Sequence, residues 1–142
     1  MELPPEKLAD LRVKHIEMLQ TVITRMAGYA ASFKSYCITV TTAVIGFSLS
    51  VHRPGVAALA LLPILFFALA DAQYLRVERR FRGAFDLVRK QDWGVMPTFE
   101  ITLEHAPAES YLRSATSWSI VSFYAPLAIG DLIAGLGAWC YG

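Results

Sequence analysis

Residues 35–70 read SYCITVTTAVIGFSLSVHRPGVAALALLPILFFALA, and this stretch decides the fold. Two runs within it, 35–51 and 56–70, carry no charged residue. At 1.5 Å per residue the first run reaches about 26 Å, which is close to the thickness of the bilayer hydrocarbon. The tetrad His52-Arg53-Pro54-Gly55 between the runs favours a tight turn, so we predict a transmembrane helical hairpin. The alternative is a pair of buried helices in a soluble bundle.

The composition agrees with a membrane protein. The chain has 142 residues, of which 55% are hydrophobic and 18% charged, and its formal net charge is +1. A soluble domain is less apolar and more highly charged. A nucleic-acid binder that depends on net basicity, a disulfide scaffold and a disordered tail are all excluded by these values.

A third apolar run, 118–142, is long enough to span and carries one charge, Asp131. Trp118 and Trp139 lie near its two ends, where aromatic belts meet the membrane surface. We therefore predict a third, C-terminal transmembrane helix. A re-entrant or poorly inserted segment is the alternative.

The basic residues predict the orientation. Twelve of the 13 Lys and Arg lie before the first run or between the second and third, and only Arg53 lies in the hairpin turn. By the positive-inside rule, the N-terminus and the middle segment are cytoplasmic, and the C-terminus lies outside. The expected location is the bacterial inner membrane, with several passes.

The segments outside the membrane are expected to form a cytoplasmic helical stalk. Residues 1–34 predict an amphipathic helix leading into the first span, packed on another cytoplasmic helix or on a neighbouring subunit; lying flat on the lipid is the alternative. The hairpin occupies 35–75, with spans at about 35–51 and 56–75, and Pro63 predicts a kink. Residues 76–117 predict a helix and a connector, in which 99–104 alternate like one half-buried strand. The fold class is thus an all-α integral membrane protein.

Three charged residues lie in or beside the predicted spans. A hairpin of equal rise brings Lys34 level with Asp71, where they form an ion pair or each extend separately to the headgroups. Asp131 falls near mid-membrane, and the row Gly130, Ala134 and Ala138 beside it allows close approach of helices. Asp131 therefore faces a polar lumen or another subunit, or forms a hydrogen bond within the bundle, or belongs to a segment that does not span.

The charged residues of the second cytoplasmic helix are candidates for receiving a signal. They are Arg76, Glu78, Arg79, Arg82, Asp86 and Arg89. The basic ones, together with Arg80, are suited to anionic lipid headgroups or a nucleotide phosphate, or they are simply the positive-inside signal with helix salt bridges.

The sequence shows no pattern for catalysis. No two of the three His lie at ligand spacing, and no nucleophile elbow, phosphate loop or dinucleotide fingerprint is present. We therefore expect no enzyme activity, no metal, no cofactor and no nucleic-acid partner.

Two motifs carry a resemblance to a family of small bacterial inner-membrane proteins. One is Arg25-Met26-Ala27 followed after six residues by Lys34, and the other is the stretch from Asp71 to Arg82 that reads DAQYLRVERRFR. More loosely, a hairpin on a cytoplasmic stalk is similar to the two-helix membrane effectors of bacterial anti-phage defence. That likeness implies a protein that opens the membrane when a partner signals infection.

We therefore expect a homo-oligomeric inner-membrane effector that permeabilises or depolarises the membrane. Its partners would be the lipid bilayer, further copies of the chain, and a cytoplasmic protein or nucleotide-type signal. The alternative is a non-catalytic membrane anchor or accessory subunit of a larger complex. A transporter acting alone ranks third, because three spans without inverted repeats offer no alternating-access machinery.

Overall fold

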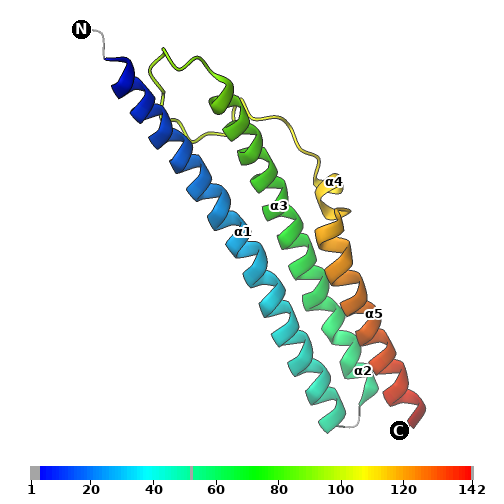
Figure 1. The fold of residues 1–142 in the computed structure, drawn as a ribbon. Coiled ribbons are helices and arrows are strands. Elements are labelled where there is room, and N and C mark those ends of the chain that lie inside the picture. The colour runs from blue at the N-terminus through cyan, green and yellow to red at the C-terminus, as the bar shows by residue number, and fades with distance from the viewer. Residues whose placement is uncertain (1–3, 52, 142) are drawn as a thin grey trace.

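The computed structural model is a bundle of three long helices (Figure 1). It describes the backbone of residues 4–51 and 53–141, and the side chains of 4–51, 53 and 55–137. The predicted all-α class is confirmed, and no strand occurs in these ranges. Three helical segments are long and apolar enough to cross a membrane, namely Pro5–Ser50, Gly55–Lys90 and Trp118–Gly137.

Helix α1, Pro5–Ser50, runs without interruption through 46 residues. Pro5 suits the first helical position because its missing N–H would have no partner there, and Glu6 complements the helix dipole. At about 1.5 Å per residue, α1 is roughly 69 Å long, more than twice the thickness of bilayer hydrocarbon. The predicted amphipathic helix and the predicted first span are therefore parts of one element.

The hairpin turn lies where Pro54 and Gly55 predict it. Ser48 Oγ donates a hydrogen bond of 2.9 Å to the carbonyl of Arg53, which closes the turn on the α1 side. The return path begins with helix α2, Pro54–Ala57, continues through the 3-10 helix η1, Ala58–Ala60, and becomes helix α3, Leu61–Lys90. The irregular 3-10 turn just precedes Pro63, whose missing N–H leaves the carbonyl four residues earlier without its helical bond.

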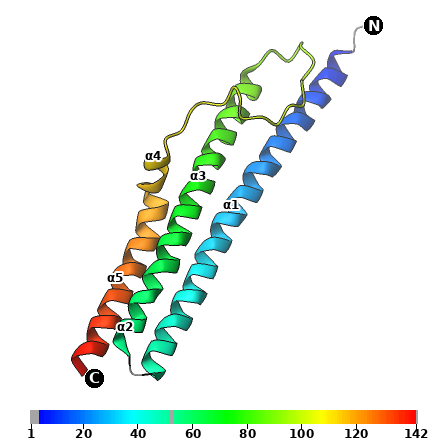
Figure 2. The same cartoon turned by 180° about the vertical axis from the view of Figure 1, so that it is seen from behind.

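Helix α3 lies between α1 on one side and helix α5, Trp118–Tyr141, on the other, as both opposite views show (Figures 1 and 2). Beyond α5, the N-terminal half of α1 and the C-terminal half of α3 continue side by side as a two-helix stalk. The short helix α4, Tyr111–Ala115, lies against α3 and leads into α5.

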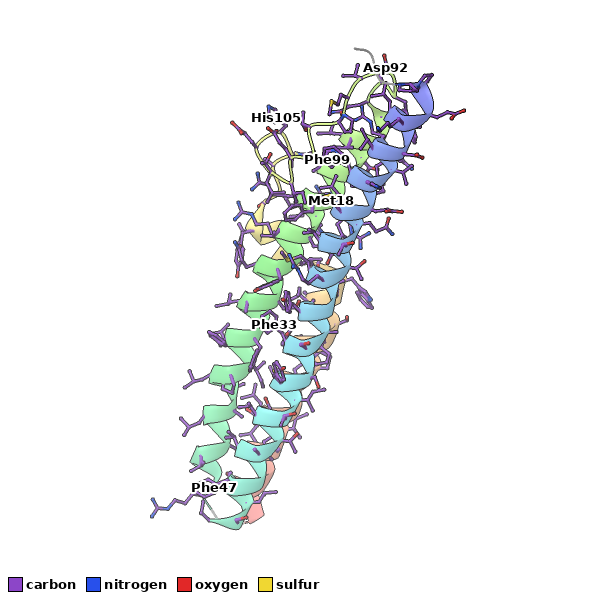
Figure 3. The ribbon with its side chains drawn as sticks, turned by 90° about the vertical axis from the view of Figure 1, so that its left-hand side faces the viewer. Met18, Phe33, Phe47, Asp92, Phe99 and His105 are labelled. Atoms are coloured by element: carbon purple, nitrogen blue, oxygen red, sulfur yellow. The ribbon has the colours of Figure 1, made fainter. Side chains whose placement is uncertain are left out.

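The connector between α3 and α4 folds back along the stalk. Figure 3 shows Asp92 at the far end of the stalk, with Phe99 and His105 on the returning chain. Side chains of the stalk bind the carbonyl oxygens of the connector: His15 Nε2 lies 3.1 Å from the Glu100 oxygen, and Arg80 donates to the Leu103 oxygen at 2.8 Å.

The strand expected at 99–104 is therefore absent from the described chain. Phe99 has φ 58°, in the left-handed region, which breaks an extended run at its first residue. A lone strand must find another strand for its backbone groups. Here the arginine and histidine side chains of the stalk take that role instead.

The tip of the stalk is held by Arg12, whose side chain is 1% exposed. Its guanidinium donates to Gln91 Oε1 at 2.7 Å and to the carbonyls of Asp92 and Val95, both at 2.8 Å. Arg12 therefore joins the first turns of α1 to the point where the connector leaves α3.

Gly83 allows the connector to lie directly on α3, because a Cβ there would lie 2.7 Å from Pro107 Cδ. We predict that Gly83→Ala lowers the free energy of unfolding by about 1–3 kcal/mol, since overpacking must push the connector away. The measurement is chemical unfolding in detergent, followed by helical circular dichroism.

The matched control is Gly28→Ala in α1, where an added Cβ meets nothing within 4 Å. Alanine should there stabilise the helix by up to about 1 kcal/mol. Equal effects of the two substitutions would contradict the close approach of the connector to Gly83.

Candidate functional site

The centre of the bundle contains an ion pair between Lys34 of α1 and Asp71 of α3. Lys34 Nζ donates a hydrogen bond to Asp71 Oδ2, and the Asp71 side chain is 1% exposed. The structure thus brings together the two residues that the equal-rise argument places side by side. Each charge lowers the cost of burying the other.

Tyr124 of α5 completes this cluster. Its hydroxyl donates to the same Asp71 oxygen at 3.3 Å, so one carboxylate joins all three helices. Lys34 Nζ also lies 5.8 Å from the ring centre of Phe123 and 5.9 Å from that of Tyr124, within the range of cation–π attraction. We call Lys34, Asp71 and Tyr124 the triad.

Polar side chains continue from the triad along the inner face of α1. Cys37, Thr41 and Ser48 are all buried, at spacings of four and seven residues. The Cys37 sulfur lies 4.0 Å from Thr41 Oγ1, and Cys37 is a free thiol. Cys140 lies outside the described side chains.

Asp131 belongs to the same interior. It follows Tyr124 by seven residues, which is two helical turns or about 10 Å, so both lie on one face of α5. Its side chain is 2% exposed, and neither carboxylate oxygen has a hydrogen-bond partner among the described residues. Thr41 follows Lys34 by the same seven residues, so Thr41 and Asp131 lie at similar levels, with Ser48 two turns beyond.

These side chains form a polar line through the most apolar part of the bundle. Its members are Lys34, Asp71, Tyr124, Cys37, Thr41, Asp131 and Ser48. Apolar side chains pack around the triad end of the line, among them Ile64 and Ile120. Nearly every member carries a proton that it can share or exchange.

Asp131 is buried in the structure, and the alternatives that the sequence leaves open for its role stay predictions. It lies inside the bundle of one chain rather than on a surface that could face a lumen or another subunit. It also lacks the hydrogen bond expected of a buried carboxyl within the bundle. Gly130 is exposed on the outer side of α5 with nothing within 4 Å of a Cβ, Ala134 is half-buried, and the side chain of Ala138 lies outside the described residues.

The charged residues in the C-terminal half of α3 are mostly paired. Arg76 and Arg79 bind Glu109 through its carbonyl and its carboxylate, at 2.8 Å each. Arg82 binds Glu78 at 2.7 Å, and Arg89 lies 3.5 Å from Asp86. The first two contacts tie the connector to α3, and the other two stabilise the surface of α3 by a few tenths of a kcal/mol each.

Within the described ranges, no three His, Cys, Asp or Glu side chains gather closely enough to hold a metal ion. His15 of α1 binds the connector through the Glu100 carbonyl, and His105 lies on the connector itself. His52 lies outside the described residues.

Sequence reasoning missed Tyr124, Arg12 and the line of Cys37, Thr41 and Ser48. The polar line had a signal, because three small polar residues recur at helical spacing within a charge-free run. Tyr124 had none, since the rotation of α5 about its axis depends on how three helices pack together.

Comparison with known proteins adds no assignment: the chain matches no protein-family model, no curated protein and no solved structure. The resemblance carried by Arg25-Met26-Ala27, Lys34 and the stretch from Asp71 to Arg82 therefore stays a prediction.

The triad yields a test of its own. We predict that Asp71→Leu lowers the free energy of unfolding by about 2 kcal/mol, because Lys34 is left without its counter-charge in apolar surroundings. Adding Lys34→Met should recover most of that loss, for a coupling energy of about 1–2 kcal/mol. The measurement is a double-mutant cycle from unfolding in mixed detergent.

The control cycle uses Arg89→Met and Asp86→Leu, whose side chains are 59% and 56% exposed. Its coupling should be at most about 0.5 kcal/mol, because solvent screens such pairs. A coupling at the triad no larger than this control would show that the buried pair does not hold α1 to α3.

Proposed function

We propose that the protein is a multi-pass protein of the bacterial inner membrane that depolarises it by letting protons pass along the polar line. The observation that carries this proposal is Asp131, a buried carboxyl without a partner inside three apolar helices. Ionisable groups in such a position are costly and are typical of proton relays and ion pathways. The proposal keeps the expected depolarisation and moves the path into the interior of each protomer.

The outward faces of the helices support the proposed contact with membrane lipid. Large apolar side chains, which together we call the apolar belt, point outward from α1, η1, α3 and α5, on the part of the bundle farthest from the connector. They are Phe47, Leu49, Leu59, Leu62, Leu65, Phe66, Leu69, Ile129, Leu132, Ile133 and Leu136. Such a continuous apolar surface is typical of a membrane contact, and Figure 3 shows Phe47 at this end.

The basic residues support an orientation with the stalk in the cytoplasm. Twelve of the 13 Lys and Arg lie from the triad toward the stalk, and only Arg53 lies at the hairpin turn. Lys34 and Asp71 then stand at the cytoplasmic entrance of the line, and Ser48 stands near its outer end.

The narrowness of the interior favours protons over larger ions. A hydrated metal ion needs a wide lumen or a ring of ligands. A proton needs only exchangeable groups and a few waters, and the polar line supplies the groups. Asp131 can take up and release a proton between the triad and Ser48.

The wider role in this proposal is that of an effector, as in the anti-phage systems that the architecture resembles. The stalk would receive the trigger from a cytoplasmic protein or a nucleotide-type signal. The exposed Gly130 leaves a place where the α5 helices of two copies could approach within a homo-oligomer.

The test is proton entry into liposomes that contain the purified protein, driven by a potassium diffusion potential and followed with a trapped pH dye. We predict that the wild-type protein speeds proton entry. Asp131→Leu should return the rate to that of protein-free vesicles, because the relay loses its central carboxyl. Asp131→Asn should do the same.

The matched control is Asp86→Asn, which removes an exposed carboxyl from the stalk and should leave the rate unchanged. Equal rates for the wild-type protein and Asp131→Leu would refute the proposed path, as would a wild-type rate equal to that of empty vesicles.

One observation favours the alternative function of a membrane anchor or accessory subunit. Trp93, Val95 and Met96 are exposed at the tip of the stalk, farthest from the apolar belt. Under this alternative a soluble protein copurifies with the wild-type chain, and Trp93→Ser with Met96→Ser reduces its recovery. Asp131→Asn should leave that recovery unchanged.

A further inference from the structure

A pocket of about 490 Å³ opens where α5 begins. Arg79 of α3 and Arg113 of α4 face the segment Thr116, Ser117 and Trp118 across it. Glu109 also lines it, and we call these six residues the arginine pocket. It lies where the last connector residues give way to the apolar window of α5, which begins at Trp118.

The charge balance of the arginine pocket is positive. Its one acidic side chain, Glu109, accepts from Arg79 at 2.8 Å and lies 3.9 Å from Arg113. Two guanidinium groups thus share one carboxylate, and the Arg113 side chain is 78% exposed. A guanidinium has five N–H donors, so Arg113 keeps most of its donors free. Ser117 Oγ also has no partner among the described residues.

A second opening lies farther along the same two helices. A groove of about 430 Å³ runs between α3 and α5, with Leu65, Ala68, Val121 and Ala125 among its lining residues. All its lining side chains are apolar except that of Tyr124. We call it the apolar groove.

The arginine pocket and the apolar groove follow one seam. Arg79 and Ala68 are 11 residues apart, about three helical turns, so they lie on the same face of α3. On α5, Val121 follows Trp118 by one turn. The apolar groove thus follows the arginine pocket toward the hairpin turn, and both helices become more apolar in that direction.

We propose that this seam binds an anionic glycerophospholipid, with its headgroup phosphate in the arginine pocket and an acyl chain in the apolar groove. Arginine suits phosphate because its planar fork matches two phosphate oxygens. Basic pockets between membrane helices on the cytoplasmic side are typical sites for anionic headgroups. Trp118, 84% exposed, has the position of an interfacial aromatic anchor. This site is independent of proton passage.

The experiment is thermal unfolding of the full chain in a neutral detergent with added ligand. Phosphatidylglycerol should raise Tm more than phosphatidylcholine at equal concentration, and inorganic phosphate should leave Tm unchanged. A rise with inorganic phosphate equal to that with phosphatidylglycerol would assign the pocket to a soluble phosphate. Equal increases in Tm with the two lipids would show that the lipid charge has no role. Either of these two results overturns the proposal.

The variants test the two parts of the seam separately by native mass spectrometry titration with phosphatidylglycerol. Arg113→Gln should weaken binding about fivefold, the effect of one basic residue on an anionic lipid. Arg89→Gln, at an arginine of the stalk that is 59% exposed, should leave binding unchanged. Equal weakening by both variants would indicate only general surface charge and overturn the site.

Two further pairs of variants separate a loss of lipid binding from a loss of folding, because the two members of each pair are closely matched. Thr116→Glu should weaken binding more than Thr116→Gln, because the two side chains have similar size and differ in charge. Ala125→Phe should fill the groove and weaken binding, whereas Ile129→Phe, on an exposed position of the same helix, should not. The proposal fails if neither pair differs.

Discussion

The structure depends on the ion pair between Lys34 and Asp71. It lies between the stalk and the apolar belt, and it fixes which residue of α1 faces which residue of α3. Apolar surfaces alone would tolerate a slip of the two helices, because apolar contacts are non-directional and gain little from one particular register. A buried charge that loses its partner is costly, so the pair specifies the register. Tyr124 extends the same constraint to α5.

Much of this arrangement could be predicted from the sequence. The charge-free runs, the Pro54-Gly55 turn and equal rise along two antiparallel helices together predict that Lys34 meets Asp71. The path of the connector could not be predicted, because alternating apolar residues suggest a strand only if another strand is available. Here Arg80 and His15 bind the connector carbonyls from the stalk, and Phe99 takes a left-handed conformation. Arg12 was missed for the same reason, since its role depends on backbone groups distant in sequence.

For Asp131, only part of its placement could be predicted from the sequence. Its position near the middle of an apolar run is evident from the sequence, whereas its direction depends on the rotation of α5. A buried polar group without a partner costs stability, and it persists in proteins mainly where function requires it. Placed on one face of α5 with Tyr124, it extends the polar groups of the triad toward Ser48. The proposed proton path therefore needs one chain, and any assembly of several chains would only multiply it.

The number of chains that form one proton path tests most directly whether the path lies inside each protomer. Proton entry can be measured in liposomes prepared over a wide range of protein-to-lipid ratios, down to fewer than one chain per vesicle on average. A path inside each protomer predicts that the fraction of conducting vesicles follows the fraction that holds at least one chain. Conduction that vanishes at single occupancy and rises as a higher power of protein density would contradict it and assign the path to a lumen between subunits.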